Sequence, residues 1–497
     1  SSSSRAVTTS ASVGGGGGAG SSGGKPGRMG QSSYSRFVST ASASRNLANL
    51  SLAMTVDRPI LLHGPAGAGK SLLAREVARL AGEGNTSTTT SNNSHHFGGG
   101  GSYPGDSAAT SPALLELHLD DQTDSKSLLG SHACTDVPGE FAWQPGALTR
   151  AAMAGTWVLF EDLDRAAFEV LAAIGPLLEG RPLALPGRRK PLRAAPGFRV
   201  FGTVTTSGPG RVVLGGAADF GALWTHIAVE PLSIPETLEV SRKRYPDLPT
   251  PALKRLLHTM VVARGPTASG HRGGFGFASR SSAGREPGVR DFLKLCSRVE
   301  VLGVFDSVDE MDDGDDSVDG GGDEGDDLRD DGGWFCSEGQ ALPAVVESLD
   351  VFAGHLTTKE ALTHAAEVVA GLWNVLPSKA VELAITRRPE FVIEDDYLKI
   401  GRVTLPRLNQ MKGSGDSSSF APTSHALRLM ETLAASARAC EPVLLVGETG
   451  CGKTALVQRL ASGTGRDLVV QNLSLQTDGA DLLGGFRPVE IRQLAQV

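Results

Sequence analysis

The 497-residue sequence predicts an α/β fold: a parallel sheet covered by helices, then a helical subdomain, then the start of a second, similar core. Over residues 59–232, short apolar runs flanked by glycine alternate with stretches of helical periodicity. This alternation is typical of a parallel sheet that is buried on both faces. A glycine-rich turn at residues 64–71 recurs at residues 447–454, which indicates that one module occurs twice.

The apolar runs of the first core are expected to form strands, and the segments between them helices. The expected strands are PILLHG (59–64), LLELHL (114–119), WVLF (157–160), FRVFGTVT (198–205) and IAVEPL (227–232), and the expected helices are 71–81, 148–154 and 165–178. Between residues 233 and 376 the apolar positions recur at helical spacing, as at Leu253, Leu256, Leu257 and Met260. We expect this second part to be helical.

Composition shifts divide the chain, because stretches rich in Gly, Ser, Asn or Asp lack the apolar residues that a packed core needs. The expected organisation is a disordered Ser/Gly-rich segment (1–48), a large α/β subdomain (49–232) with a low-complexity insert (84–112), a helical lid subdomain (233–400) with disordered inserts (266–288 and 306–333), a linker with a lead-in helix (401–440), and a truncated second core (441–497).

The net charge of −8 reflects one segment, because 14 of the 55 acidic residues lie between Asp306 and Asp331. The charge therefore supports no conclusion about nucleic acid or membranes, and we expect neither as a direct partner. The acidic run is expected to be a solvated loop, with docking of a basic partner as the alternative. Five cysteines without a CxxC pair argue against a disulfide framework or a zinc cluster. Residues 1–56 contain no acidic residue, which leaves a disordered tail or a targeting segment open.

The two glycine-rich turns both satisfy the pattern GxxxxGK[ST], and each follows an apolar run and opens a helix. Glycines let consecutive N–H groups converge on a polyphosphate, the helix N-terminus adds partial positive charge, and the lysine neutralises the β- and γ-phosphates. Ser71 and Thr454 are expected to supply a hydroxyl to Mg²⁺. The predicted nucleotide contacts are Gly64, Pro65, Ala66, Gly67, Ala68, Gly69, Lys70 and Ser71 in the first copy and Gly447, Glu448, Thr449, Gly450, Cys451, Gly452, Lys453 and Thr454 in the second.

Hydrolysis also needs acids that hold Mg²⁺ and align water, normally Asp then Glu at the end of a neighbouring strand. Here Glu161 and Asp162 follow WVLF, in reversed order. We expect both to be catalytic and Glu161 to bind the metal, although the reversal puts the positioning of water in doubt. A solvated acidic turn is the alternative.

Three weaker candidates lie further along the chain. Thr205, or its neighbour Thr206, ends the strand FRVFGTVT and is placed to reach the γ-phosphate or water, while Arg290 opens a helix that can face the nucleotide. A plain strand-end threonine and a solvated arginine are the alternatives. His226 directly precedes the apolar run IAVEPL, and we interpret it as a packed or surface histidine.

The phrases QTDSKSLLGS and QTDGADLLGGFRPV follow the second expected strand of each copy, FAWQPGALTRAAMAGTWVLFEDLDRA leads into the acidic pair, and LKIGRVTLPR precedes the second module. On these residues the chain resembles the AAA+ superfamily of P-loop ATPases and, within it, the midasin family. The resemblance covers most of 49–232 and 398–497.

This resemblance implies ATP and Mg²⁺ as cofactors and an intramolecular ring of AAA+ modules. It places Glu161 and Asp162 at the Walker B positions, Thr205 at sensor one and Arg290 at sensor two. It also implies a nuclear machine, nucleolar and nucleoplasmic, that uses ATP to release assembly factors from precursors of the large ribosomal subunit. Two alternatives remain: a nucleotide-binding scaffold whose first module is hydrolytically silent, and an ATPase of the MoxR or chelatase type.

Overall fold

The computed structural model describes residues 37–85, 114–121, 123–134, 141–185, 191–206, 221–265, 287–305, 337–356, 358–408 and 420–474, together with Thr477 and Leu482. Apart from two residues at one end of each, the expected inserts 84–112 and 266–288 lie outside this set. The expected insert 306–333 and its acidic run lie wholly outside it. None of the described helices is both long and apolar enough to cross a membrane.

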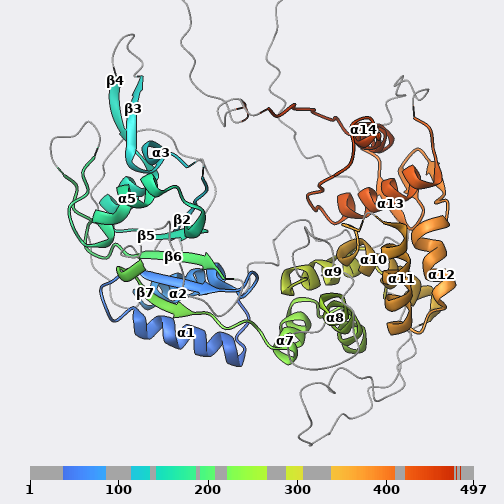
Figure 1. The fold of residues 1–497 in the computed structure, drawn as a ribbon, viewed down its shortest axis with the longest axis horizontal. Helices are drawn as coiled ribbons and strands as arrows, with labels where there is room; N and C mark the ends of the chain where they lie inside the picture. The colour runs from blue at the N-terminus through green and yellow to red at the C-terminus, as the bar shows by residue number, and fades with distance from the viewer. Residues whose placement is uncertain are drawn as a thin grey trace, which may run out of the picture. The chain divides into compact units, whose positions relative to one another are not determined.

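The first core contains a five-stranded parallel sheet in the order β2-β5-β6-β1-β7, which confirms the predicted α/β class (Figure 1). Strand β1, which leads into the first glycine-rich turn (residues 64–71, the first P-loop), lies between β6 and β7. The carboxyl ends of these three parallel strands lie at the same edge of the sheet. The strands are β1 (Ile60–Gly64), β2 (Leu114–His118), β5 (Trp157–Glu161), β6 (Val200–Thr205) and β7 (Thr225–Ala228).

Both faces of this sheet are covered, because alternate side chains of a strand point to opposite faces. Ile60 and Leu62 join one apolar cluster with α1 and α2, whereas Leu61 joins the other with α3, α4 and α5. All three side chains are at most 1 % exposed. The helices are α1 (Ala41–Ala53), α2 (Lys70–Asn85), α3 (Ser125–Leu129), α4 (Ala147–Ala154) and α5 (Phe168–Leu178).

Helix α1 corrects one boundary that the sequence predicted. It begins at Ala41, behind an N-cap formed by Thr40, inside the segment 1–48 that was expected to be disordered. Leu50 is fully buried and packs with residues of β1 and α2, which stabilises the helix although most of its residues are small or polar. Long-range packing therefore orders a stretch whose composition suggested a tail.

A hairpin and a 3₁₀ turn complete the large subdomain, and neither was expected. Strands β3 (Gly130–Cys134) and β4 (Phe141–Pro145) pair antiparallel between α3 and α4, and a 3₁₀ helix, η2 (Leu163–Arg165), follows β5. A side chain at Gly130, where φ is +125°, would collide with the backbone of Gln144. The hairpin therefore requires glycine at this position.

The lid subdomain is helical, as predicted. Its core joins Leu253, Leu256 and Leu257 with Val299 and Trp373, all at most 2 % exposed. The helices are α7 (Ile234–Arg244), α8 (Thr250–Arg264), α9 (Val289–Val301), α10 (Glu338–Phe352), α11 (Lys359–Leu372) and α12 (Pro377–Val381), continued by the π-helical turn η3 (Glu382–Thr386).

A three-stranded antiparallel sheet lies across the expected boundary at residue 400. Strands β8 (Phe391–Ile393), β9 (Tyr397–Ile400) and β10 (Val403–Pro406) share a core with α13 (Ser424–Arg438) and with α14 (Lys453–Thr464), the helix of the second P-loop. The stretch before the second P-loop is therefore a folded unit that holds α14.

The strand expected before the second P-loop differs from its counterpart β1. Residues 442–446 form no strand with any described part of the chain. Leu444 and Val446 are 87 % and 86 % exposed, and Val469 is 89 % exposed. In the first core β1 is enclosed by β6 and β7, whereas no described residue takes those places beside 442–446.

Candidate nucleotide site

The first P-loop joins the end of β1 to the start of α2. Gly67 and Gly69 have φ angles of +83° and +84°, a conformation that glycine adopts without strain. Lys70 is 8 % exposed, and its Nζ donates to the carbonyl oxygens of Gly64 and Pro65 at 2.8 and 2.9 Å. The loop therefore forms a turn around its own lysine at the N-terminus of a helix, which is a geometry suited to a phosphate chain.

The second P-loop repeats this geometry. Gly450 and Gly452 have φ angles of +84° and +87°. Lys453 Nζ donates to the carbonyl oxygens of Gly447 and Glu448 at 2.8 and 2.7 Å. The same turn thus occurs at two positions whose surroundings differ.

Arg290, the predicted sensor-two residue, lies beside the first P-loop. It is in the first turn of α9, and a Cβ placed on Gly67 would be 3.8 Å from its Cγ. Burial and then the charge of Arg290 lower the pKa of Lys70, while Asp162 and Asp164 raise it. Two cations thus face each other across a glycine turn, an arrangement that a polyanion would stabilise.

Asp162 follows β5 in a left-handed conformation with a φ of +54°, which is uncommon for a residue other than glycine. Its backbone N–H donates to the hydroxyl of Thr203, a buried residue of β6, at 3.3 Å. Asp162 and Asp164 both raise the pKa of Lys70, so both carboxylates are near enough for their charge to act on the lysine of the P-loop. Asp164 is not among the site residues predicted from the sequence.

Glu161 lies at the end of β5 but pairs with neighbours on β2 and α2. His118 Nδ1 is 2.9 Å from its Oε2, and Arg75 is 3.7 Å from its Oε1. Arg75 in turn donates twice to Glu116, at 2.6 Å each. Glu161 Oε1 is buried and makes no hydrogen bond with the described residues. The metal-binding role expected for Glu161 therefore stays a prediction.

Thr205 and Thr206 both lie next to the first residue of the P-loop. Thr205 is opposite Gly64 in the register of β6 and β1, and the N–H of Thr206 donates to the carbonyl oxygen of Gly64 at 3.1 Å. The structure therefore brings together Thr205, the P-loop and Arg290, although their roles remain predictions. His226 lies on β7, where its Nε2 is 2.8 Å from the carbonyl oxygen of Gly221 and its ring centroid is 6.0 Å from that of His63.

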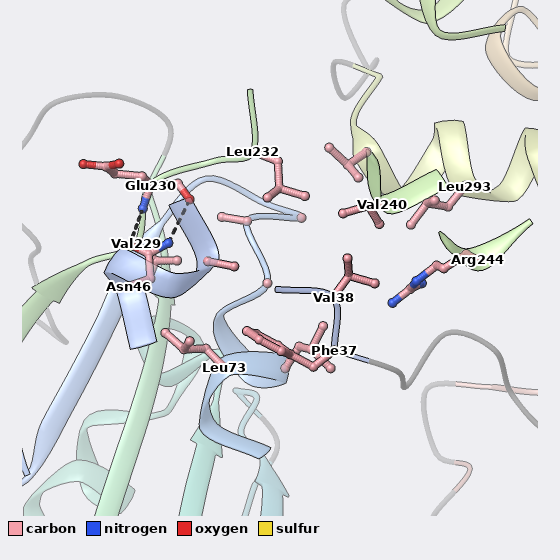
Figure 2. Close-up of a pocket in the computed structure, with 16 residues that line it drawn as sticks. Phe37, Val38, Asn46, Leu73, Val229, Glu230, Leu232, Val240, Arg244 and Leu293 are labelled. Carbon is pink, nitrogen blue, oxygen red and sulfur yellow. Dashed lines mark hydrogen bonds between the residues drawn. The ribbon is translucent and has the colours of Figure 1, made fainter. Parts of the chain in front are cut away.

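An apolar cavity of about 110 Å³ adjoins the first P-loop, which contributes Gly67, Ala68 and Gly69 to its wall. The other walls come from α1 and the segment leading into it, the first turn of α2, the chain after β7, and the lid helices α7 and α9 (Figure 2). The residues that face one another there include Phe37, Val38, Val229, Leu232, Val240 and Leu293. The cavity suits a flat, largely apolar group attached to a phosphate chain.

Comparison with known proteins identifies the modules. The family model for the AAA domain of the dynein-related subfamily matches residues 107–214 and 442–494, and that for the midasin AAA lid domain matches residues 236–375. Midasin from Dictyostelium discoideum is 29 % identical over 521 residues, covering 92 % of this chain. These matches identify AAA modules and a lid domain similar to that of midasins.

A second relative, midasin from Giardia intestinalis, is 25 % identical over 76 % of the chain. The chain spans only 8 % and 7 % of the lengths of these two midasins. Among solved structures, NtrX from Brucella abortus is 14 % identical, with a TM-score of 0.35, and the alignment covers 69 % of this chain and 67 % of that one. The same protein in complex with ADP is 15 % identical, with a TM-score of 0.34 and coverage of 69 % and 68 %.

Phe37, Val38 and Asn46 form a cavity wall that was not predicted from the sequence, because they lie in the segment expected to be a disordered tail. The internal repeat of the sequence contains the information that predicts an ordered helix here. A lead-in helix was expected before the second P-loop, and the structure has α13 there and α1 at the corresponding place before the first. The repeat thus predicts a helix in front of each P-loop strand.

Proposed function

We propose that the first module binds ATP with Mg²⁺, with the triphosphate on the P-loop and the adenine in the adjoining cavity. The observation that supports this most directly is the pair of cations, Lys70 and Arg290, beside a glycine turn that opens into an apolar cavity. A bound polyanion would relieve the repulsion between these two like charges, of which Lys70 is buried and Arg290 exposed. We assign Mg²⁺ to the Ser71 hydroxyl, at the end of this turn, and to the Asp162 carboxylate, whose charge acts on Lys70. Mg²⁺ prefers such oxygen ligands and keeps several waters.

Equilibrium titration of the chain with a fluorescent ATP analogue tests this proposal. Lys70→Ala should abolish most of the binding at the first site, while Lys453→Ala should leave that site unchanged. Lys243→Ala is the matched control, because Lys243 forms an exposed pair with Glu239 at the surface of α7. Binding that survives Lys70→Ala undiminished would contradict the assignment.

A second candidate function is a nucleotide-binding scaffold with a silent first module, and the contacts of Glu161 favour it. The side chain of Glu161 is engaged by His118 and Arg75, and Asp162 occupies the position where a longer glutamate is usual. ATP turnover of the full-length protein carrying Asp162→Asn distinguishes the two candidates. Unchanged turnover would support the scaffold, whereas a large drop would support hydrolysis at this site.

We further propose that the module belongs to a ring of AAA+ modules that remodels precursors of the large ribosomal subunit in the nucleus. The similarity to midasins supports this proposal. Sedimentation of the tagged full-length protein with large-subunit precursors, and its nuclear location under the microscope, are the expected results. Exclusion from the nucleus, with no association with these precursors, would refute it.

A further inference from the structure

Glu236, in the first turn of α7, accepts hydrogen bonds from two distant parts of the chain. The backbone N–H and the hydroxyl of Ser233 donate to its carboxylate at 2.9 Å each, which caps the helix. The backbone N–H and the hydroxyl of Ser42, on α1, donate to the same carboxylate at 2.5 and 2.8 Å. A single buried carboxylate thus joins α1 to the beginning of the lid.

A second pair of hydrogen bonds strengthens this junction. The side-chain amide of Asn46, one turn after Ser42 on α1, donates to the carbonyl oxygen of Glu230 at 3.3 Å and accepts from its N–H at 3.4 Å (Figure 2). The ion pair between Arg45 and the Glu230 side chain is different, because both side chains are more than 60 % exposed. Such surface pairs contribute little to stability.

These contacts connect two walls of the cavity beside the first P-loop. Ala43 and Asn46 of α1, with the preceding Phe37, form one wall, and Val240 and Arg244 of α7 form part of another. The geometry points to Glu236 as a positioning residue for nucleotide binding: through Ser42 it fixes α1 against α7 and so sets the cavity to the thickness of a nucleobase. This inference rests on the proposed function.

The chemistry of the four donors requires a carboxylate at this position. Ser42 and Ser233 present only N–H and O–H groups to Glu236, so a glutamine would direct its own N–H₂ group at donors. Burial alone would raise the pKa of Glu236, but these donors lower it to about 2. The carboxylate is therefore charged at neutral pH, and the junction remains closed without a pH-dependent step.

The test compares two ligands, Mg-ATP and Mg-tripolyphosphate, on the same chain. Tripolyphosphate has no base and probes the P-loop alone. Glu236→Gln and Ser42→Ala should each raise the Kd for Mg-ATP about tenfold, equivalent to about 1.4 kcal/mol, and change the Kd for Mg-tripolyphosphate by less than twofold. Ser42→Thr, which keeps both donors, should restore the affinity for ATP. Ser51→Ala is the matched control on α1, because the exposed Ser51 hydroxyl donates to the carbonyl oxygen of Leu47 within the same helix, and it should change neither value.

The outcomes separate this inference from the function on which it rests. If the parent chain binds neither ligand, the proposed nucleotide site is wrong. If the parent binds ATP no more tightly than tripolyphosphate, the cavity does not hold the base. The third outcome is that the parent binds ATP more tightly than tripolyphosphate, but the two variants weaken the binding of both ligands equally or of neither ligand. Glu236 is then a purely structural cap and the inference is overturned. Should Glu236→Gln fail to fold, Ser42→Ala decides alone, because it removes only one hydroxyl.

Discussion

Replacing Arg298 with methionine is expected to destabilise the lid by about 3–5 kcal/mol, because it takes one positively charged partner from the buried acids Glu347 and Glu441. Arg298 is 3 % exposed. Its guanidinium lies 3.4 Å from Glu347 and 2.8 Å from Glu441, and it donates to the hydroxyl of Ser436 at 2.6 Å. Glu347 is fully buried and is also held by Arg402 at 2.7 Å. The network therefore links α9 and α10 to α13 and to the start of the second module.

The loss of stability in Arg298→Met should depend on pH, and the protonation of Glu347 decides whether it grows or shrinks as pH falls. Burial raises the pKa of Glu347, and Arg402 and Arg298 lower it. Without Arg298 its pKa in the folded protein should rise further above the unfolded value. Such a carboxyl destabilises the fold above its folded pKa, and the penalty is relieved as pH falls and the group takes up a proton. The deficit of Arg298→Met should therefore be larger at pH 8 than at pH 5.

Urea unfolding at both pH values, combined with hydrogen exchange of peptides from α9 and α10, measures this deficit within the lid. Adding Glu347→Leu to Arg298→Met should recover much of the loss, since the remaining acids keep other partners: Asp350 pairs with Arg402, and Glu441 with Lys294. A loss below about 1 kcal/mol, or one that grows in acid, would refute the argument that uncompensated burial dominates.

Three further results are expected. Arg290→Ala should weaken Mg-ATP binding about tenfold in the titration, with an unchanged melting temperature, because it removes a cation beside the P-loop. Gly401→Ala should cost about 2–4 kcal/mol in urea unfolding, because φ is +54° and the new methyl would collide with the Glu431 carboxylate, which pairs with Arg402. The pKa of Glu236, about 2 against an ordinary 4.5, contributes stability at neutral pH that is lost as pH falls from about 4.5 to 2. Glu236→Gln should therefore be less stable than the parent at pH 7, by up to about 3 kcal/mol, with a difference that shrinks in acid.

The sequence predicts those elements whose signal is local. The runs around Leu61, Phe160 and Phe201 are continuously apolar because each strand is covered on both faces, and all three were expected as strands. Helix α1 has no such run, and Leu50 contributes its packing only once the sheet is present. The contacts of Glu161 follow from the register of β2 and β5, which sets His118 opposite it. No motif in the sequence specifies that register.

The two P-loops of this chain separate local from long-range contributions to a nucleotide site. Their glycine angles and lysine contacts agree closely, although β1 is buried in a sheet and the corresponding residues Leu444 and Val446 are almost fully exposed. The turn that accepts phosphates is therefore encoded by the eight residues of the motif. The cavity beside the first turn is different, because its walls come from segments as far apart as Phe37 and Leu293. Affinity for the triphosphate should thus be a property of the motif, and affinity for the base a property of the folded module around it.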